Sequence, residues 1–125
     1  MPLTILYVDD DSEDLAIFQE ALNDINENIR FIPLKSAHDA LALLNRQISL
    51  PNLIFVDINM PVMDGKEFLK NLKTDKRFQN IPVIMYTTSR QQKEKDECKG
   101  LGAHDFITKT STYPELIQRL RTVIQ

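Results

Sequence analysis

The chain has 125 residues, 42% hydrophobic and 26% charged, which is an ordinary composition for one soluble globular domain. Its net charge of −3 gives no reason to expect nucleic-acid binding, and no apolar run approaches the roughly 20 residues that cross a bilayer. A single cysteine rules out an internal disulfide framework and the N-terminus lacks the basic segment of a secretory signal, so we expect a cytoplasmic protein.

Short apolar runs alternate with stretches of helical period from one end of the chain to the other. Residues 3–8 (LTILYV) form a β-type run that meets the acidic cluster 9–11, and apolar residues then recur at helical spacing through Ile25. The weaker run 30–34 predicts a second strand, in which Pro33 indicates an edge position because proline cannot donate to a central ladder.

The middle of the chain contains a third strand between two helices. Ser36 is a candidate N-cap for the helix that precedes this strand. Residues 53–56 (LIFV) are a continuous apolar run, which is typical of a parallel strand buried on both faces. This strand ends at Asp57, and the loop after it leads to Asp64, a candidate cap for the next helix.

The last third of the chain repeats the pattern twice. Residues 81–86 predict a fourth strand that Thr87 closes, and the polar stretch 90–99 predicts a helix with a poor apolar face. Residues 105–108 predict a fifth strand that ends at Lys109. A capping-box pattern then opens the last helix.

Complete alternation of five strands with five helices indicates an α/β fold with a mostly parallel sheet covered on both faces. We find no internal repeat and no linker in the sequence. We therefore expect residues 1–125 to form a single domain with no output domain.

Side chains that can do chemistry follow four of the predicted strands at their carboxyl ends, namely Asp9 and Asp10, Asp57, Thr87 and Lys109. Each of them alone has an ordinary explanation, such as a helix cap or a solvated lysine. Because open α/β sheets bind ligands beyond the carboxyl ends of their strands, we expect these residues to converge. Their position just past four different apolar runs favours a functional site.

Charge suggests which chemistry such a site could perform. Three carboxylates in one pocket repel one another, and oxygen ligands of this kind suit Mg2+. A divalent ion and the ammonium of Lys109 would offset the carboxylates and could also hold a phosphoryl group. Asp57 heads the central strand and is the best candidate for a nucleophile that forms an aspartyl phosphate.

Four segments match a known pattern: YVDD at 7–10, FVDINMPVMDG at 55–65, MYTTS at 85–89 and GAHDFITK at 102–109. With them, the chain resembles the receiver domains of two-component response regulators over essentially its whole length, and among these the single-domain chemotaxis-regulator type. The resemblance implies a doubly wound, flavodoxin-like (βα)5 three-layer sandwich. It also implies a five-stranded parallel sheet in the order 2-1-3-4-5.

The resemblance also implies a role for each matching residue around the metal. Asp57 would be the phosphoacceptor and a metal ligand. Asp10 would ligate Mg2+ directly, and Asp9 would act mainly through water. The backbone carbonyl of Asn59 would complete the protein ligands.

A second group of residues is expected to respond to the phosphoryl group. Lys109 would pair with it and Thr87 would swing in to donate a hydrogen bond. Phe106 stands where the family often has an aromatic switch coupled to that threonine.

The expected partners are proteins. In the family, the phosphoryl donor is a phosphohistidine on a sensor histidine kinase or a histidine phosphotransfer protein. Three residues lie on segments that flank the switch, so we expect a downstream protein target to dock near Arg90, Lys93 and Tyr113. We expect a monomer or weak dimer.

Two residues, Thr88 and Thr110, depart from the family pattern, and Thr110 bears on the position of Lys109. The family lysine is usually followed by proline, often after a cis bond, whereas Thr110 stands here. A cis bond to a non-proline residue costs about 2.5–4 kcal/mol. Either this bond is trans with a rearranged loop, or the site holds the strain.

The sequence leaves one alternative function, a pseudo-receiver that binds partners without phosphorylation. The presence of every acidic, hydroxyl and lysine position argues against it. A phosphatase is not expected, because aspartate-nucleophile phosphatases need a second Asp where this chain has Asn59. A conventional enzyme is not expected either, because a receiver catalyses only its own phosphorylation and dephosphorylation.

Overall fold

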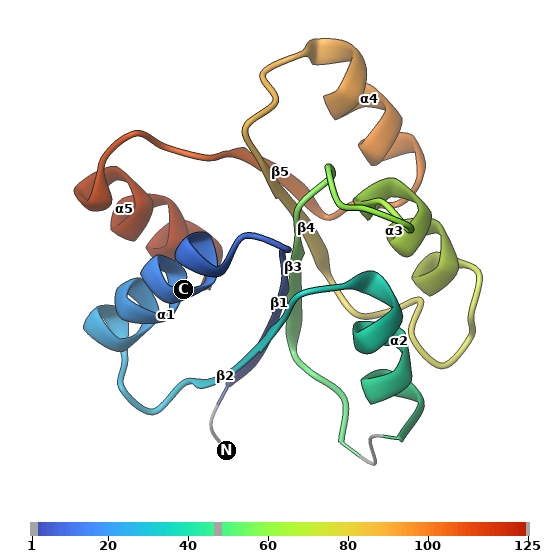
Figure 1. Ribbon diagram of the computed structural model, residues 1–125, viewed down its shortest axis with the longest axis horizontal. Helices are drawn as coiled ribbons and strands as arrows, with labels where there is room; N and C mark the ends of the chain where they lie inside the picture. Colours follow the sequence, from blue (N-terminus) through green and yellow to red (C-terminus); the bar gives the residue numbers. More distant parts are fainter. Residues whose placement is uncertain (1–2, 47–48, 125) are drawn as a thin grey trace.

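The computed structural model describes residues 3–46 and 49–124, and strands and helices alternate throughout them, as predicted. Figure 1 shows the elements in chain order. None of the helices in this described part of the chain is long and apolar enough to span a membrane. The elements are β1 (Thr4–Val8), α1 (Ser12–Ile25), β2 (Arg30–Leu34), α2 (Ala37–Arg46), β3 (Leu53–Val56), α3 (Gly65–Lys73), β4 (Val83–Thr87), α4 (Gln92–Gly100), β5 (Asp105–Thr108) and α5 (Tyr113–Ile124).

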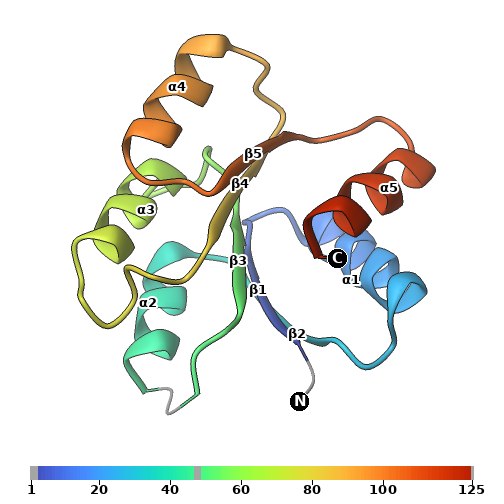
Figure 2. The same cartoon turned by 180° about the vertical axis from the view of Figure 1, so that it is seen from behind.

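The five strands form one parallel sheet in the order β2-β1-β3-β4-β5, which confirms the predicted fold class and strand order. Pro33 lies in β2 at the edge of the sheet, as expected of a residue without a backbone donor. Helices α1 and α5 cover one face, and α2, α3 and α4 cover the other (Figure 1). Figure 2 shows the same three layers from behind.

Each face of the sheet has its own hydrophobic core because successive strand residues point to opposite sides. In β3 all four residues are buried, which confirms the reading of LIFV as a strand covered on both faces. Ile54 and Val56 pack in the core beneath α2, α3 and α4, whereas Leu53 and Phe55 pack in the core beneath α1 and α5.

An aromatic cluster fixes α1 against the sheet close to the strand ends. The ring centroid of Phe18 on α1 lies 4.4 Å from that of Tyr7 on β1 and 4.9 Å from that of Phe55 on β3. The ring of Tyr86 on β4 lies 5.7 Å from Tyr7 and from Phe18. Buried aromatic pairs of this kind contribute about 0.5–1.5 kcal/mol each beyond the area they bury.

Helix caps occur where the sequence predicts them. The side chain of Ser36 accepts a hydrogen bond from the Asp39 amide at 3.0 Å, and that of Asp64 accepts one from the Glu67 amide at 2.9 Å. The fourth strand begins at Val83 rather than residue 81, since Pro82 has no N–H to give the ladder.

The loop between β3 and α3 folds back tightly onto the end of β3 at Gly65. The Gly65 amide donates to the carbonyl oxygen of Ile58 at 2.8 Å. A Cβ atom at Gly65 would lie 2.2 Å from the carbonyl oxygen of Asp57 and 2.8 Å from the Cα of Ile58. Backbone fills the space that a side chain would need, so glycine is required here for the chain after Asp57 to keep its course.

We predict that Gly65→Ala lowers the free energy of unfolding by about 1–3 kcal/mol, because the added methyl group must push the backbone of Asp57 and Ile58 away. Urea unfolding followed by circular dichroism measures the change. Gly100→Ala is the matched control, since a Cβ atom there meets no atom within 4 Å. Equal free energies of unfolding for the two variants would show that the backbone at Asp57 and Ile58 can move away from a Cβ atom at residue 65 without loss of stability.

Candidate functional site

The predicted site residues converge at the carboxyl ends of the strands. Asp9 and Asp10 follow β1, Asp57 follows β3, and one carboxylate oxygen from each lies within 4.8 Å of the others. Asp9 is fully buried and Asp57 is 8% exposed, whereas Asp10 faces solvent. The neighbouring positions of β1 and β3 in the sheet bring the three acids together across nearly fifty residues of sequence.

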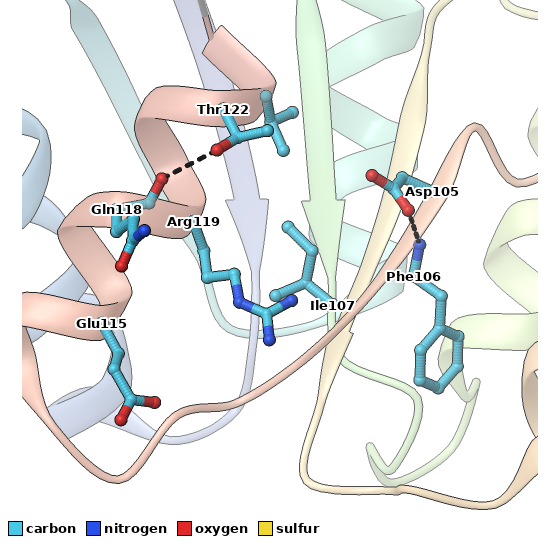
Figure 3. A pocket seen from close by; sticks show the side chains of 8 residues that line it. Asp105, Phe106, Ile107, Glu115, Gln118, Arg119 and Thr122 are labelled. Carbon is cyan, nitrogen blue, oxygen red and sulfur yellow. Dashed lines mark hydrogen bonds between the residues drawn. The ribbon is translucent and has the colours of Figure 1, made fainter.

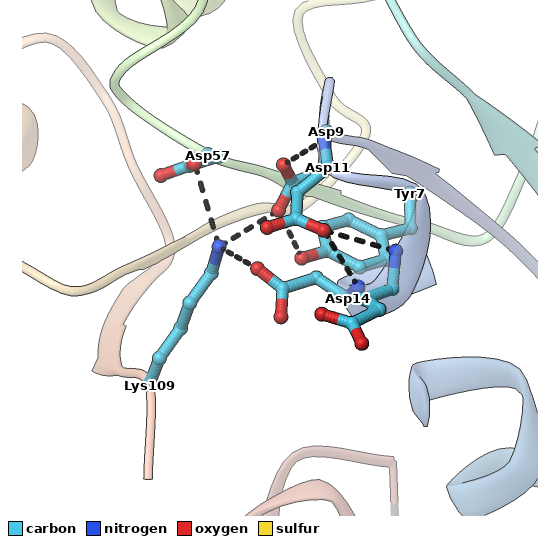
Figure 4. Close-up of polar contacts among 7 residues, drawn as sticks. Tyr7, Asp9, Asp11, Asp14, Asp57 and Lys109 are labelled. Carbon is cyan, nitrogen blue, oxygen red and sulfur yellow. Dashed lines mark hydrogen bonds and ion pairs between the residues drawn. The ribbon is translucent and has the colours of Figure 1, made fainter. Parts of the chain in front are cut away.

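Lys109 contacts two of these carboxylates, Asp9 and Asp57, and a fourth one, Asp14 (Figure 4). Its Nζ donates to Oδ2 of Asp14 at 2.7 Å, to Oδ2 of Asp9 at 2.8 Å and to Oδ2 of Asp57 at 3.4 Å. An ammonium has three N–H donors, so each of them has one carboxylate as its partner. Lys109 therefore ties α1, β1 and β3 to the end of β5.

The segment that carries Lys109 has an ordinary backbone. The Lys109 amide donates to the carbonyl oxygen of Thr87 at 2.7 Å, which extends the β4–β5 pairing to the site. No peptide bond within residues 3–46 and 49–124 is cis, so the bond between Lys109 and Thr110 is trans. The lysine reaches the carboxylates with threonine after it, which decides between the two conformations that the sequence left open.

Two residues of the site, Tyr7 and Asp14, were not predicted from the sequence. The Tyr7 hydroxyl donates to Oδ2 of the buried Asp9, and the Asp11 amide donates to its Oδ1 at 3.0 Å. Tyr7 precedes Asp9 by two positions, so strand periodicity could have placed both on one face. Asp14 lies in the first turn of α1, directly after the acidic cluster, and its proximity to the strand end was the available signal.

Two buried oxygen atoms at adjoining strand ends have no hydrogen-bond partner among the described residues. They are Oδ1 of Asp57, after β3, and Oγ1 of Thr87, at the end of β4. An unpaired buried polar atom costs about 1–3 kcal/mol, so two of them on neighbouring strands are a candidate position for a bound group. The free oxygens lie on two of the three residues that the family resemblance implies for phosphoryl binding.

The site carries more negative than positive charge. Burial raises the pKa of the Asp57 carboxyl above its usual value, Lys109 partly offsets this rise, and the charge of Asp9 adds to it. Burial alone would lower the pKa of Lys109, but hydrogen bonds to Asp14 and Asp9 outweigh it and hold that pKa above its usual range. Oxygen donors in excess of the local positive charge fit a hard divalent cation such as Mg2+.

The remaining predicted residues lie on the segments around this centre. Asn59 lies in the exposed loop after β3. Phe106 on β5 is half-buried and packs toward the core under α4, where the Nζ of Lys95 lies 5.9 Å from its ring centroid. Arg90 and Lys93 are exposed at the start of the α4 region.

Tyr113 contacts α1, a neighbour that the sequence did not indicate. Its hydroxyl donates to Oδ2 of Asp24 on α1, and its ring packs with the core beneath α1 and α5. Arg90 and Lys93 belong to the α4 side. The side chain of Tyr113 thus bridges α5 to α1, and a partner face that includes all three residues stays a prediction.

A cavity of about 600 Å3 between β5 and α5 lies apart from the carboxylates (Figure 3). Asp105, Phe106, Glu115 and Arg119 are among the residues that line it. Asp9, Asp10, Asp57, Thr87 and Lys109 do not line it. The converging charges, and not this cavity, define the candidate site.

Comparisons with known proteins agree with this geometry. A family model described as the response regulator receiver domain matches residues 5–121. Response regulator Rcp1 of Synechocystis sp. is 29% identical over 98% of this chain and 86% of its own length. The phosphate regulon transcriptional regulatory protein PhoB of Escherichia coli is 32% identical over 90% of this chain, which spans about half (49%) of PhoB.

Solved structures are similar over almost the whole chain. The phosphorylated cyanobacterial phytochrome response regulator RcpA superposes with a TM-score of 0.90 at 27% identity, over 98% of this chain and 91% of that one. The Mn2+-bound form of Rcp1 superposes with a TM-score of 0.86 at 29% identity, with the same coverage of 98% and 91%.

We predict that Tyr7→Phe lowers the free energy of unfolding by about 1–3 kcal/mol, because the buried Asp9 carboxylate loses a charge-assisted hydrogen bond. Urea titration at pH 7 measures the loss. Tyr86→Phe serves as the control, since it removes a hydroxyl from the same aromatic cluster for which the structure shows no hydrogen bond within the described residues. An equal loss in both variants would contradict a specific role for the Tyr7–Asp9 bond.

Proposed function

The chain belongs to the response regulator receiver domain family, whose members are signalling proteins rather than conventional enzymes, and from this we propose that it accepts a phosphoryl group on Asp57. One observation carries the proposal. Three carboxylates and Lys109 meet at the strand ends, where buried Oδ1 of Asp57 and Oγ1 of Thr87 have no partner in the described part of the chain.

The proposed reaction moves the phosphoryl group from a phosphohistidine on a sensor histidine kinase or a histidine phosphotransfer protein. The phosphorus–nitrogen bond breaks and a phosphorus–oxygen bond to Asp57 forms, while the donor imidazole leaves and takes up a proton. Water later hydrolyses the aspartyl phosphate. The chain contributes position and charge, which are the main requirements of phosphoryl transfer.

Each residue has a defined task in this reaction. Asp57 supplies the attacking oxygen. Lys109 donates to the oxygens of the incoming group, and Thr87 turns its free hydroxyl toward the same oxygens. The burial of Asp57 and Thr87 strengthens these interactions because little water competes for them.

A divalent cation, which we propose to be Mg2+, completes the site. Asp10, Asp57 and the backbone carbonyl of Asn59 would hold it, with Asp9 beside them. When bound, the ion neutralises the charge that develops on the transferring oxygens. Support comes from the all-oxygen donor set of this cluster and from the relative Rcp1, which was crystallised with Mn2+.

The output is proposed to be a change of shape that a protein target reads. Thr87 closes β4 and Phe106 lies on the adjoining strand β5, so a shift of the threonine reaches β5 directly. Arg90 and Lys93 are exposed and follow Thr87 within six positions, and they are proposed to contact the target together with the region of Tyr113. We propose that this signalling takes place in the cytoplasm between a monomer or weak dimer and its partners.

We predict that intact mass rises by about 80 Da, one phosphoryl group, when the protein is incubated with a small phosphodonor and Mg2+. Asp57→Ala and omission of Mg2+ should each abolish the gain. A folded wild-type protein that binds Mg2+ but gains no mass would instead indicate an interaction module that works without phosphorylation.

We also predict that Asp10→Asn weakens Mg2+ binding roughly tenfold or more, since the charge of the ligands sets the affinity for a hard cation. Isothermal titration calorimetry measures the affinity. Asp11→Asn removes a neighbouring charge from outside the carboxylate cluster and keeps a side chain that can cap α1, so it is the matched control. Equal affinity in the two variants would exclude Asp10 as a ligand.

A further inference from the structure

The shortest ion pair of Lys109 is with Asp14, a residue that is not needed to explain the metal or the phosphoacceptor. The Nζ of Lys109 lies 2.7 Å from Oδ2 of Asp14, compared with 3.4 Å from Oδ2 of Asp57. The N-cap of α1 orients the first turn, because Oδ1 of Asp11 accepts hydrogen bonds from the amides of Glu13 and Asp14. The helix therefore presents the Asp14 carboxylate to the lysine.

The three carboxylates that contact Lys109 differ in how easily they can release it. Asp9 is fully buried, so it cannot exchange the ammonium for bulk water. Asp14 has a side chain that is 33% exposed. It also lines a cavity of about 240 Å3 between α1 and the start of α5, together with Glu20, Tyr86 and Tyr113. Water in that cavity can solvate the Asp14 carboxylate once the lysine leaves it.

We propose that Asp14 is a positioning residue that holds Lys109 in the resting state and competes with the phosphoryl group for its ammonium. This inference rests on the proposed function of Asp57. The three N–H donors of Lys109 are already used by three carboxylates. A phosphoryl group on Asp57 replaces the 3.4 Å contact with that residue and offers further oxygens to the ammonium that Asp9 and Asp14 hold. Of these two, the partly exposed Asp14 can give up its contact at the lower cost.

The competition predicts that loss of the Asp14 charge favours the phosphorylated state. In Asp14→Asn the lysine has one fewer anionic partner, so a phosphoryl analogue on Asp57 meets a freer ammonium. A partly exposed ion pair supports an effect of about two- to fivefold on the affinity for the analogue. Glu20→Gln removes an equal charge from the same cavity but leaves every observed contact of Lys109 in place. The difference between the two variants is therefore the effect of the Asp14–Lys109 contact, without the effect of losing one negative charge from the cavity.

Beryllofluoride, an analogue of the phosphoryl group, tests the affinity when it is titrated at saturating Mg2+ into the wild type, Asp14→Asn and Glu20→Gln. A separate measurement follows the lysine itself in metal-free protein by 15N NMR of side-chain ammonium groups. The resonance of Lys109 is assigned by its loss in Lys109→Arg. We expect Asp14→Asn to shift this resonance and to speed its hydrogen exchange, whereas Glu20→Gln leaves it unchanged.

Tighter beryllofluoride binding in Asp14→Asn alone, together with the altered Lys109 resonance, is the expected result. Equal beryllofluoride affinities in Asp14→Asn and Glu20→Gln, or weaker binding in Asp14→Asn than in the wild type, would overturn the proposed competition. In either case, beryllofluoride binding by the wild type would still support the function of Asp57. A wild type that binds Mg2+ but takes up no beryllofluoride would overturn the proposed function and this inference together.

Discussion

The ammonium of Lys109 lies among carboxylates that would otherwise repel one another, and the arrangement of the strand ends depends on this contact. Asp9 and Asp57 are both buried, where two like charges a few ångströms apart are costly. The lysine donates to both and to Asp14, so one side chain from β5 compensates acids that follow β1 and β3 or begin α1. The compensation is incomplete, and a site left with excess negative charge has affinity for a divalent cation.

The fold provides the geometry for this contact through ordinary packing. A parallel sheet brings its carboxyl ends to one edge, and the order β2-β1-β3-β4-β5 places the acid-bearing strands β1 and β3 side by side. The aromatic cluster around Phe18 holds α1 down on the sheet, which keeps Asp14 within reach of Lys109. Gly65 lets the loop after β3 close on the Asp57 backbone. The backbone and aromatic side chains below the site are thus held by packing. The polar side chains at the strand ends are the part of the site that can move when a ligand binds.

Much of this could be predicted from the sequence, because the strands are short apolar runs and four of them end at acidic, hydroxyl or lysine side chains. The strand order came from the family resemblance, since alternation alone does not determine which strands are neighbours. Asp14 and Tyr7 were missed because their roles depend on which way long side chains point after α1 docks on the sheet. The last helix and Tyr113 at its start were predicted, but the hydroxyl of Tyr113 reaches Asp24 on α1, a contact between residues 89 positions apart that no local pattern encodes.

A crystal structure of the protein with Mg2+ and beryllofluoride tests the central claim most directly. The account predicts beryllium bonded to an oxygen of Asp57, the metal on Asp10, and the hydroxyl of Thr87 turned to a fluorine atom. It also predicts that the Nζ of Lys109 has left Asp14 for another fluorine atom. Crystals that hold the metal but carry no beryllofluoride on Asp57 would contradict the claim that this charge balance exists to receive a phosphoryl group.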